Sequence, residues 1–405
     1  MTAAPSERER TGWLPLIEAL RAIAAISVVF HHAHDLADPK RFAGAWVFDG
    51  FGQWGVLLFF LLSGFLLCDY FWQPIGWRDV GAFYVRRMAR IGPGYYVAVG
   101  LLFLFFAQHA LLFSTFGAKQ VAANATFTHW LWPQYSSSLN VDGALWTLSI
   151  EMLLYAFMPI LAWTIGRWPV LATSGWIALG VAWRVLVARS GGGLLSFYRL
   201  DHGGPGPGIA HLFVARQFPG LVCIFAMGIA LRRAMVAGPL RTLAERPVVA
   251  PRLWMLFALL VPSVLLLRET NRASDYQHWI WFVGFDLAVS LLLLPVLAWA
   301  SRPVEGALTR PLRIATWLGE RSYSIYLWHF PVLLAVSGRG TTGGPPQTDH
   351  IVARLLLAGL FTLIAASVSY SAVEKPAQAW GRRLAKRISV RPSRTPAVDP
   401  APAAV

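Results

Sequence analysis

The chain has 405 residues, of which 56% are hydrophobic and only 14% are charged. This composition excludes an ordinary soluble domain and predicts a multi-pass membrane protein. The net charge of +15 requires no nucleic-acid partner, because anionic lipid headgroups of the inner leaflet attract basic segments. The two cysteines, Cys68 and Cys223, stand far apart in apolar sequence, which excludes a disulfide framework and predicts that both are packing residues.

About ten apolar stretches are long enough to cross a bilayer, so we predict an all-α, polytopic bundle of about ten transmembrane helices. With ten spans and both ends inside, lysine and arginine concentrate in the inner segments, which predicts that both termini are cytoplasmic. The predicted spans cover residues 14–36, 50–71, 91–116, 143–166, 168–188, 211–231, 252–267, 278–300, 315–337 and 351–373.

The domain organisation is simple. We expect a cytoplasmic tail over residues 1–12, one membrane domain over 13–376, and a basic, Pro- and Ala-rich cytoplasmic tail over 377–405 whose end is disordered. The first apolar run is too long for a signal peptide and contains charged residues, so we expect it to stay in the mature protein. No appended soluble domain and no internal repeat are expected.

The first predicted span carries an arginine and a histidine in apolar sequence. Eleven residues separate Arg21 from His32, which places them within about 20° of one helix face and about 16 Å apart along the axis. His31 points about 80° away from Arg21 and so lies off this stripe. Ionisable residues at membrane depth are costly and usually face a protein or water-filled interior, so this stripe predicts a functional site.

Two further motifs follow the first span. Ser63 stands beside a glycine in the second span, and this small pair would admit either a neighbouring backbone or a ligand. After the next predicted inner loop, Arg86, Arg87 and Arg90 crowd one region with aromatic residues nearby. Three guanidinium groups suit a phosphate-bearing ligand, but arginine clusters at inner helix ends also simply fix membrane orientation.

The fourth span contains a carboxylate, Glu151, with Tyr155 one helical turn later. A buried carboxylate requires a partner, and Arg21 or a first-span histidine is the expected one, as a structural ion pair or as a group that orients a catalytic base. The ninth span adds Tyr326 and His329; a single histidine in such a helix is more often a packing residue than a catalyst.

Several common catalytic motifs are missing from the sequence. It contains no GxSxG elbow, phosphate-binding Walker loop or HExxH helix, which weakens serine-hydrolase, nucleotide-hydrolysing and zinc-protease interpretations. No metal cofactor is expected.

Taken in order, the motifs resemble those of the acyltransferase-3 family of membrane proteins, over residues 16–376. The first-span Arg21 and His32 are similar to the family's R-x10-H signature, and Glu18 stands where the family more often has aspartate. The other similar segments are Phe59-Phe60-Leu61-Leu62-Ser63-Gly64-Phe65, Arg86-Arg87-Met88-Ala89-Arg90-Ile91-Gly92-Pro93, Trp146-Thr147-Leu148-Ser149-Ile150-Glu151, Tyr326-Leu327-Trp328-His329 and Glu374-Lys375-Pro376.

The resemblance implies an enzyme that moves an acyl group from acyl-CoA to a hydroxyl of a sugar or other acceptor. It makes His32 the expected general base, with a transient acyl-imidazole as the alternative mechanism. Arg21 is expected to hold CoA phosphate or stabilise oxyanion charge, and Glu151 to orient or balance the site. The implied phosphate-binding residues are Arg86, Arg87 and Arg90, and the candidate substrate-pocket residues are His31, Ser63, Tyr155, Tyr326 and His329.

The sequence also allows a second class of function, transport. The same buried Arg, His and Glu set would serve a proton-coupled transporter or glycan exporter. Such carriers often have inverted repeats, whereas the charged motifs here crowd into the first 160 residues, which favours the enzyme. The arginine-rich, alanine-rich composition is typical of GC-rich bacteria, so we expect a bacterial plasma membrane location and a glycoside-antibiotic or cell-envelope glycan acceptor. The sequence does not indicate an oligomeric state.

Overall fold

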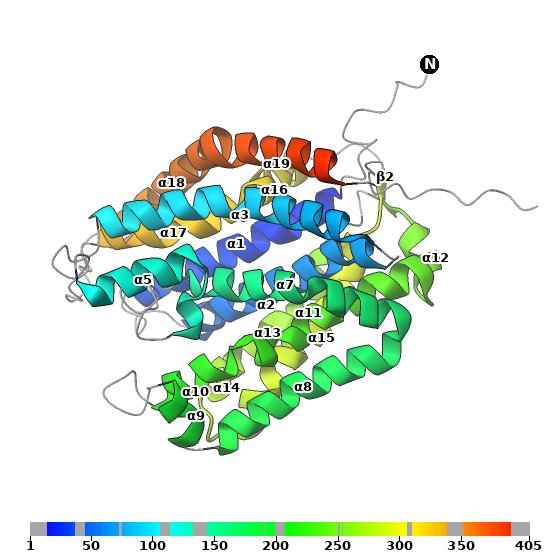
Figure 1. Ribbon diagram of the computed structural model, residues 1–405, viewed down its shortest axis with the longest axis horizontal. Coiled ribbons are helices and arrows are strands. Elements are labelled where there is room, and N and C mark those ends of the chain that lie inside the picture. Colours follow the sequence, from blue (N-terminus) through cyan, green and yellow to red (C-terminus); the bar gives the residue numbers. More distant parts are fainter. Residues whose placement is uncertain are drawn as a thin grey trace, which may run out of the picture.

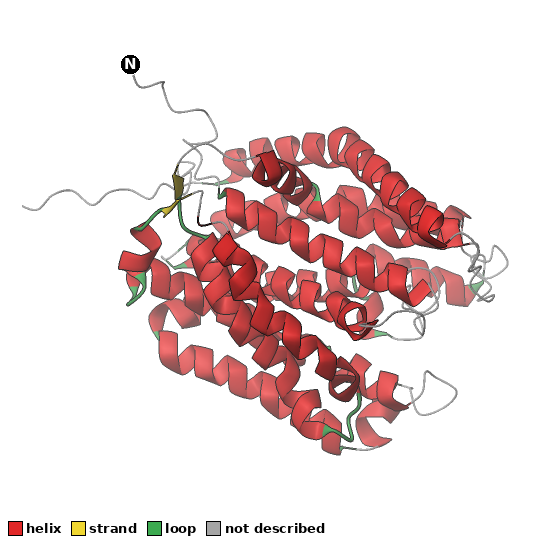
Figure 2. Cartoon of the chain, turned by 180° about the vertical axis from the view of Figure 1, so that it is seen from behind, coloured by secondary structure: helices red, strands yellow, loops and turns green. Residues whose placement is uncertain are grey.

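The computed structural model describes residues 14–36, 45–72, 75–105, 114–132, 144–190, 192–198, 207–249, 252, 254–305, 310–337 and 351–389. These residues are almost entirely helical (Figure 2), with one parallel pair of two-residue strands, β1 (Val248–Val249) and β2 (Val304–Glu305). The predicted all-α membrane fold is therefore confirmed. The predictions for residues 1–12 and for the end of the 377–405 tail lie outside the described residues.

Within the described part of the chain, nine helical segments are long and apolar enough to cross a membrane. They run side by side in one bundle (Figure 1), and one further apolar helix, α17 (Ser322–Ser337), is shorter. The long helices are α1 (Pro15–Leu36), α2 (Ala45–Leu67), α3 (Trp77–Phe105), α7 (Trp146–Arg167), α8 (Pro169–Arg189), α11 (Phe218–Ala237), α13 (Trp254–Leu265) with its extension to Ser274, α15 (Trp279–Ala300), and α18 (Ile351–Ser369) continued by α19 (Lys375–Ile388).

Short elements connect or extend these helices. A π-helical turn, η9 (Tyr370–Glu374), joins α18 to α19, and the helix changes direction at this junction (Figure 1). The remaining elements are η3 (Cys68–Phe71), α5 (Thr115–Ala125), η4 (His129–Leu131), α9 (Gly192–Phe197), α10 (Pro207–Ala215), α12 (Arg241–Glu245), η7 (Leu266–Glu269), α14 (Thr270–Ser274) and α16 (Arg310–Glu320).

The ninth predicted span differs from the structure. Residues 315–337 form the second half of α16 and all of α17, with the break at Arg321. Helix α16 is amphipathic and charged at both ends, so its sequence does not suit hydrocarbon on all sides. Gly319 lies directly against the main chain of α1 at Glu18, where a Cβ atom would be 1.9 Å from the carbonyl oxygen. Through this contact α16 packs against the first turn of α1.

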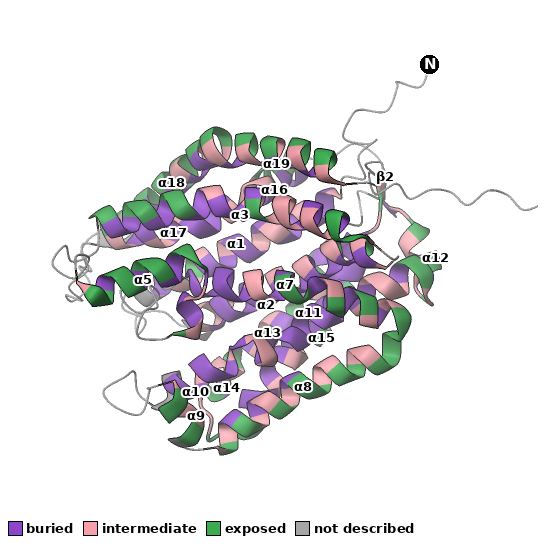
Figure 3. Ribbon diagram, viewed as in Figure 1, coloured by how far each residue is buried: buried purple, intermediate pink, exposed green. Residues whose placement is uncertain are grey.

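Two glycines allow α2 and α11 to pack closely in the most buried layer of the bundle (Figure 3). A Cβ atom on Gly64 would lie 2.2 Å from the carbonyl oxygen of Phe225, and one on Gly228 would lie 2.2 Å from that of Leu61. Small residues permit such backbone approach between membrane helices. The interpretation of the Ser63-Gly64 pair as a close-packing site is confirmed, and both cysteines are free and buried, as expected.

Helix α1 packs against α2, α16 and α17, so its polar stripe faces the protein interior. Gly52 and Gly55 of α2 leave space for the His31 ring and for the α1 main chain at Ala24, respectively. The fold therefore places Arg21 and His32 at different depths along one helix that is enclosed by other helices.

The glycine contacts predict different effects of two glycine-to-alanine substitutions on thermal stability. Gly228→Ala should lower the midpoint of thermal unfolding in detergent, because the new methyl group must displace the α2 main chain. Gly284→Ala on α15, where a Cβ would meet nothing within 4 Å, should leave the midpoint unchanged or raise it, since alanine is favoured over glycine in helices by about 1 kcal/mol. Equal effects of the two changes would contradict this packing.

Candidate active site

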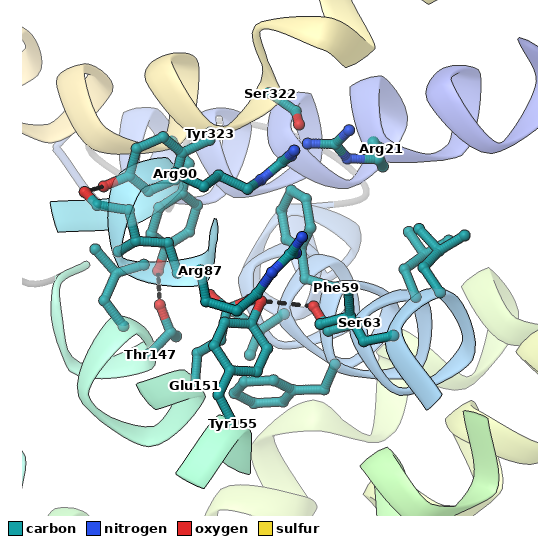
Figure 4. Close-up of a pocket in the computed structure, with 18 of the residues that line it drawn as sticks. Arg21, Phe59, Ser63, Arg87, Arg90, Thr147, Glu151, Tyr155, Ser322 and Tyr323 are labelled. Atoms are coloured by element: carbon teal, nitrogen blue, oxygen red, sulfur yellow. Dashed lines mark hydrogen bonds between the residues drawn. The ribbon is translucent and has the colours of Figure 1, made fainter. Parts of the chain in front are cut away.

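A cavity of about 290 Å³ lies between α1, α2, α3, α7 and α17. Aliphatic and aromatic side chains form much of its wall, and Figure 4 shows the polar groups that converge on it. The polar lining residues are Glu18, Arg21, Ser63, Arg87, Arg90, Thr147, Glu151, Tyr155, Ser322, Tyr323 and Tyr326.

Three arginines supply the positive charge of the cavity. Arg21 extends from α1, and Arg87 and Arg90 extend from α3 into the same space (Figure 4). Nη1 of Arg21 donates to both carboxylate oxygens of Glu18, at 2.9 and 3.1 Å. Arg90 makes no hydrogen bond or ion pair with any residue that the structure describes. Among the described lining residues the arginines outnumber the carboxylates, Glu18 and Glu151, by one, and Arg90 also interacts electrostatically with the buried Glu374.

Two polar atoms of the cavity residues have unused hydrogen-bonding capacity. Nε of Arg87 and Oγ of Ser322 are buried and have no partner among the described residues. Buried polar groups are nearly always paired, so each such group calls for an explanation. An anionic ligand with several oxygens in the cavity would satisfy them and would balance the excess positive charge.

Glu151 joins α7 to α2. Its Oε1 accepts hydrogen bonds from the hydroxyl of Ser63, at 3.1 Å, and from that of Tyr155 one turn along α7. The expected pairing of Glu151 with Arg21 or a first-span histidine differs from the structure, because Arg21 pairs with its own helix neighbour Glu18. Glu151 instead interacts electrostatically with Arg87.

A histidine pair lies outside the cavity lining, farther along α1. Nδ1 of His32 is 2.9 Å from Nε2 of His329, and their rings are stacked. His329 is fully buried and its Nδ1 donates to the carbonyl oxygen of Tyr326, at 2.6 Å. His32 is only partly buried. The His31 ring lies 5.0 Å from that of His32, and its Nδ1 donates to the Phe48 carbonyl oxygen.

Tyr326 connects the cavity with the histidine pair. Its side chain lines the cavity, while its carbonyl oxygen holds His329. The hydroxyl of Tyr326 donates to the carbonyl oxygen of Ala144, at 2.6 Å, and lies 2.5 Å from the Thr147 hydroxyl. These bonds fix the beginning of α7 against α17.

The structure thus divides the residues predicted from sequence into two groups. The cavity brings together Arg21, Ser63, Arg87, Arg90, Glu151, Tyr155 and Tyr326. His31, His32 and His329 form a separate cluster, and Arg86 does not line the cavity, because its guanidinium lies over the Tyr70 ring at 4.6 Å. Ser322 and Thr147 were not predicted, since serine and threonine in apolar helices give no distinctive signal.

A second buried polar network was also missed. Arg184 of α8 pairs with Asp286 of α15, and its other guanidinium nitrogens donate to the carbonyl oxygens of Gly220 and Phe282 at 3.2 Å. Gln53 donates to the remaining oxygen of Asp286, at 2.9 Å. Two intramembrane charges of opposite sign, Arg184 and Asp286, are a signal from which this pair could have been predicted.

The fold and the cavity define a class: an all-helical, multi-pass membrane protein with an arginine-rich interior site. The chain belongs to the acyltransferase-3 family, because the family model, described as an acyltransferase domain, matches residues 14–373. The resemblance recognised in the motifs is therefore confirmed. No solved structure matches the chain.

Curated relatives agree with this assignment. The chain is 25% identical to a putative peptidoglycan O-acetyltransferase of Bacillus subtilis, over 93% of this chain and 57% of that protein. It is 25% identical to the peptidoglycan O-acetyltransferase OatA of Listeria monocytogenes, over 90% of this chain and 56% of OatA. It is 30% identical to nodulation protein 10 of Rhizobium leguminosarum over 40% of this chain and 48% of that protein. The chain spans only about half the length of these relatives.

The Arg184–Asp286 pair predicts a strong coupling in stability. Asp286→Leu alone should destabilise the protein by about 3–5 kcal/mol, because it leaves a buried arginine without its counter-charge. The double variant Arg184→Leu/Asp286→Leu should recover much of this loss. Thermal or denaturant unfolding of the two single variants and the double variant measures the coupling, and simple additivity of the two changes would contradict it.

Proposed function

We propose that this protein is a membrane-bound O-acyltransferase that moves an acyl group from acyl-CoA to a hydroxyl of a sugar-containing acceptor. One observation carries the proposal: helix α1 presents Arg21 at an arginine-lined cavity and, eleven residues later, the partly exposed His32, which is paired with the buried His329. The two groups are about 16 Å apart along the helix. This arrangement suits an elongated donor with phosphates at one end and a thioester at the other.

The cavity supports the donor assignment through its charge and its unused hydrogen-bonding groups. Guanidinium groups bind phosphate through several charge-assisted hydrogen bonds. Arg21, Arg87 and Arg90 would hold the phosphates, and Nε of Arg87 with the Ser322 hydroxyl would gain the partners that they lack. The role proposed for Arg86 rests on the sequence alone, since its side chain lies over Tyr70.

Glu151 and Tyr155 have supporting roles in this proposal. The carboxylate is held by the hydroxyls of Ser63 and Tyr155, so its position is fixed before any ligand enters. Its charge lowers the net positive charge beside Arg87. The donor is therefore bound by a site that is already organised, which reduces the entropy cost of binding.

His32 is the proposed general base. Its imidazole takes the proton of the acceptor hydroxyl while that oxygen forms a bond to the thioester carbonyl carbon. The carbon–sulfur bond then breaks, and the imidazolium returns the proton to the departing thiolate. The ester and free CoA are the products, and the histidine is restored. A transient acyl-imidazole remains the alternative route to the same products.

The acceptor is proposed from the relatives. Two are named peptidoglycan O-acetyltransferases, so we propose a hydroxyl of a cell-envelope glycan as the acceptor and acetyl as the transferred group. Such an acceptor places the protein in the bacterial plasma membrane. An acceptor of this kind is large, which agrees with a base that is only partly buried.

Donor binding can be tested without knowledge of the acceptor. CoA and acetyl-CoA should raise the thermal midpoint of the purified protein in nanodiscs, since a ligand at a hundred times its dissociation constant adds about 2.7 kcal/mol of stability. Arg87→Gln and Arg90→Gln should weaken CoA binding about tenfold or more, because each removes charged hydrogen bonds. Arg167→Gln, at the exposed end of α7, is the matched control. The absence of any CoA effect in folded protein would contradict the donor assignment and favour a transporter.

The base is tested by substitution. His32→Ala should reduce acetyl transfer at saturating donor by about a hundredfold or more, because a positioned general base contributes a factor of that order. CoA binding, measured as the thermal shift, should persist, since His32 does not line the cavity. Full transfer activity in a folded His32→Ala preparation would exclude this residue as the base.

A further inference from the structure

We infer that His329 is a positioning residue that holds the proton of His32 on Nδ1 and thereby leaves Nε2 of His32 as the basic atom. This inference rests on the proposed function and assigns a role to the second histidine of the pair. It also names the nitrogen of His32 that meets the acceptor hydroxyl.

The hydrogen bonds of His329 determine its tautomer. Nδ1 of His329 lies 2.6 Å from the carbonyl oxygen of Tyr326, and a carbonyl oxygen can only accept. Nδ1 of His329 therefore carries the proton, and in the neutral ring Nε2 has a free electron pair. Which nitrogen of a histidine is protonated is set by the bond that the other one makes.

This assignment propagates to His32. Nδ1 of His32 lies 2.9 Å from Nε2 of His329, and a hydrogen bond between two neutral rings requires one donor and one acceptor. Because Nε2 of His329 accepts, Nδ1 of His32 donates. A proton on Nδ1 leaves Nε2 of the neutral His32 ring unprotonated.

Burial distinguishes the roles of the two rings. His329, on α17, is fully buried and stacks on the His32 ring, whereas His32 is partly exposed. Phe330 contacts the His32 ring edge-to-face at 5.1 Å and helps to fix its plane. Only His32 can meet an acceptor, and His329 acts through it.

Hydrogen bonds also connect the histidine pair with the donor cavity. The chain of bonds runs from His32 to His329, then to the carbonyl of Tyr326, whose side chain lines the cavity. Ala144 and Thr147 hold the Tyr326 hydroxyl at the beginning of α7. The orientation of the base is thus tied to a residue of the cavity wall.

Two substitutions at one position provide the test. His329→Phe keeps an aromatic ring but removes the acceptor, whereas the side-chain oxygen of His329→Gln can replace Nε2 as acceptor. We expect His329→Phe to lower kcat for acetyl transfer about tenfold to a hundredfold with little change in the KM for acetyl-CoA. His329→Gln should recover most of the lost rate.

A spectroscopic measurement gives a readout that a purely structural role would not change. In protein with nitrogen-15-labelled histidine, the signals that disappear in His32→Ala identify His32, and they should be those of a neutral ring protonated at Nδ1. The same signals should change in His329→Phe and be retained in His329→Gln. Thermal unfolding of each variant shows whether it is folded.

The outcomes separate this inference from the proposed function. A wild-type His32 ring protonated at Nε2 would overturn the inference even where His329→Phe fails to fold. Full activity of His329→Phe, with His32→Ala inactive, would overturn the inference alone. Full activity of His32→Ala would overturn the proposed base and this role of His329 together.

Discussion

The hydrocarbon interior of the membrane requires that polar side chains find their partners within the protein, and the rest of this structure follows from that requirement. Several buried ionisable groups bond to a group from another helix or from the next turn. Arg184 is bonded to Asp286 across two spans, and Glu151 accepts two hydroxyl protons. These bonds have strict geometry, so they fix the relative heights and rotations of the helices more sharply than apolar packing alone.

In the candidate site this requirement is left unmet at several atoms. In the arginine-lined cavity the described residues leave a net positive charge, an arginine Nε without a partner and a buried serine hydroxyl without a partner. Buried polar groups without a partner are costly, and an enzyme normally retains them only where a ligand supplies the missing partner. In the histidine pair, by contrast, every ring nitrogen except Nε2 of His32 has a hydrogen-bond partner among the described residues.

Much of the fold could be predicted from local sequence because apolar length and helical periodicity are local properties. The stripe of Arg21 and His32, the arginines of α3 and the carboxylate of α7 were all recognisable as polar groups at membrane depth. Their partners were not, because a partner is chosen by which helices become neighbours. Glu151 bonds to α2 instead of α1, and His329 bonds to His32 from a helix almost three hundred residues later. The break at Arg321 was signalled only by the adjacent charges of Glu320 and Arg321, which a hydropathy window averages away.

The unbroken helix α1 has a consequence for how such a protein can diversify. Its only proline, Pro15, stands at its first residue, so no proline kinks the helix between Arg21 and His32. The helix therefore sets a fixed distance between Arg21 and His32. Insertions and rearrangements elsewhere in the chain can change what approaches the histidine, but they leave the spacing between Arg21 and His32 unchanged.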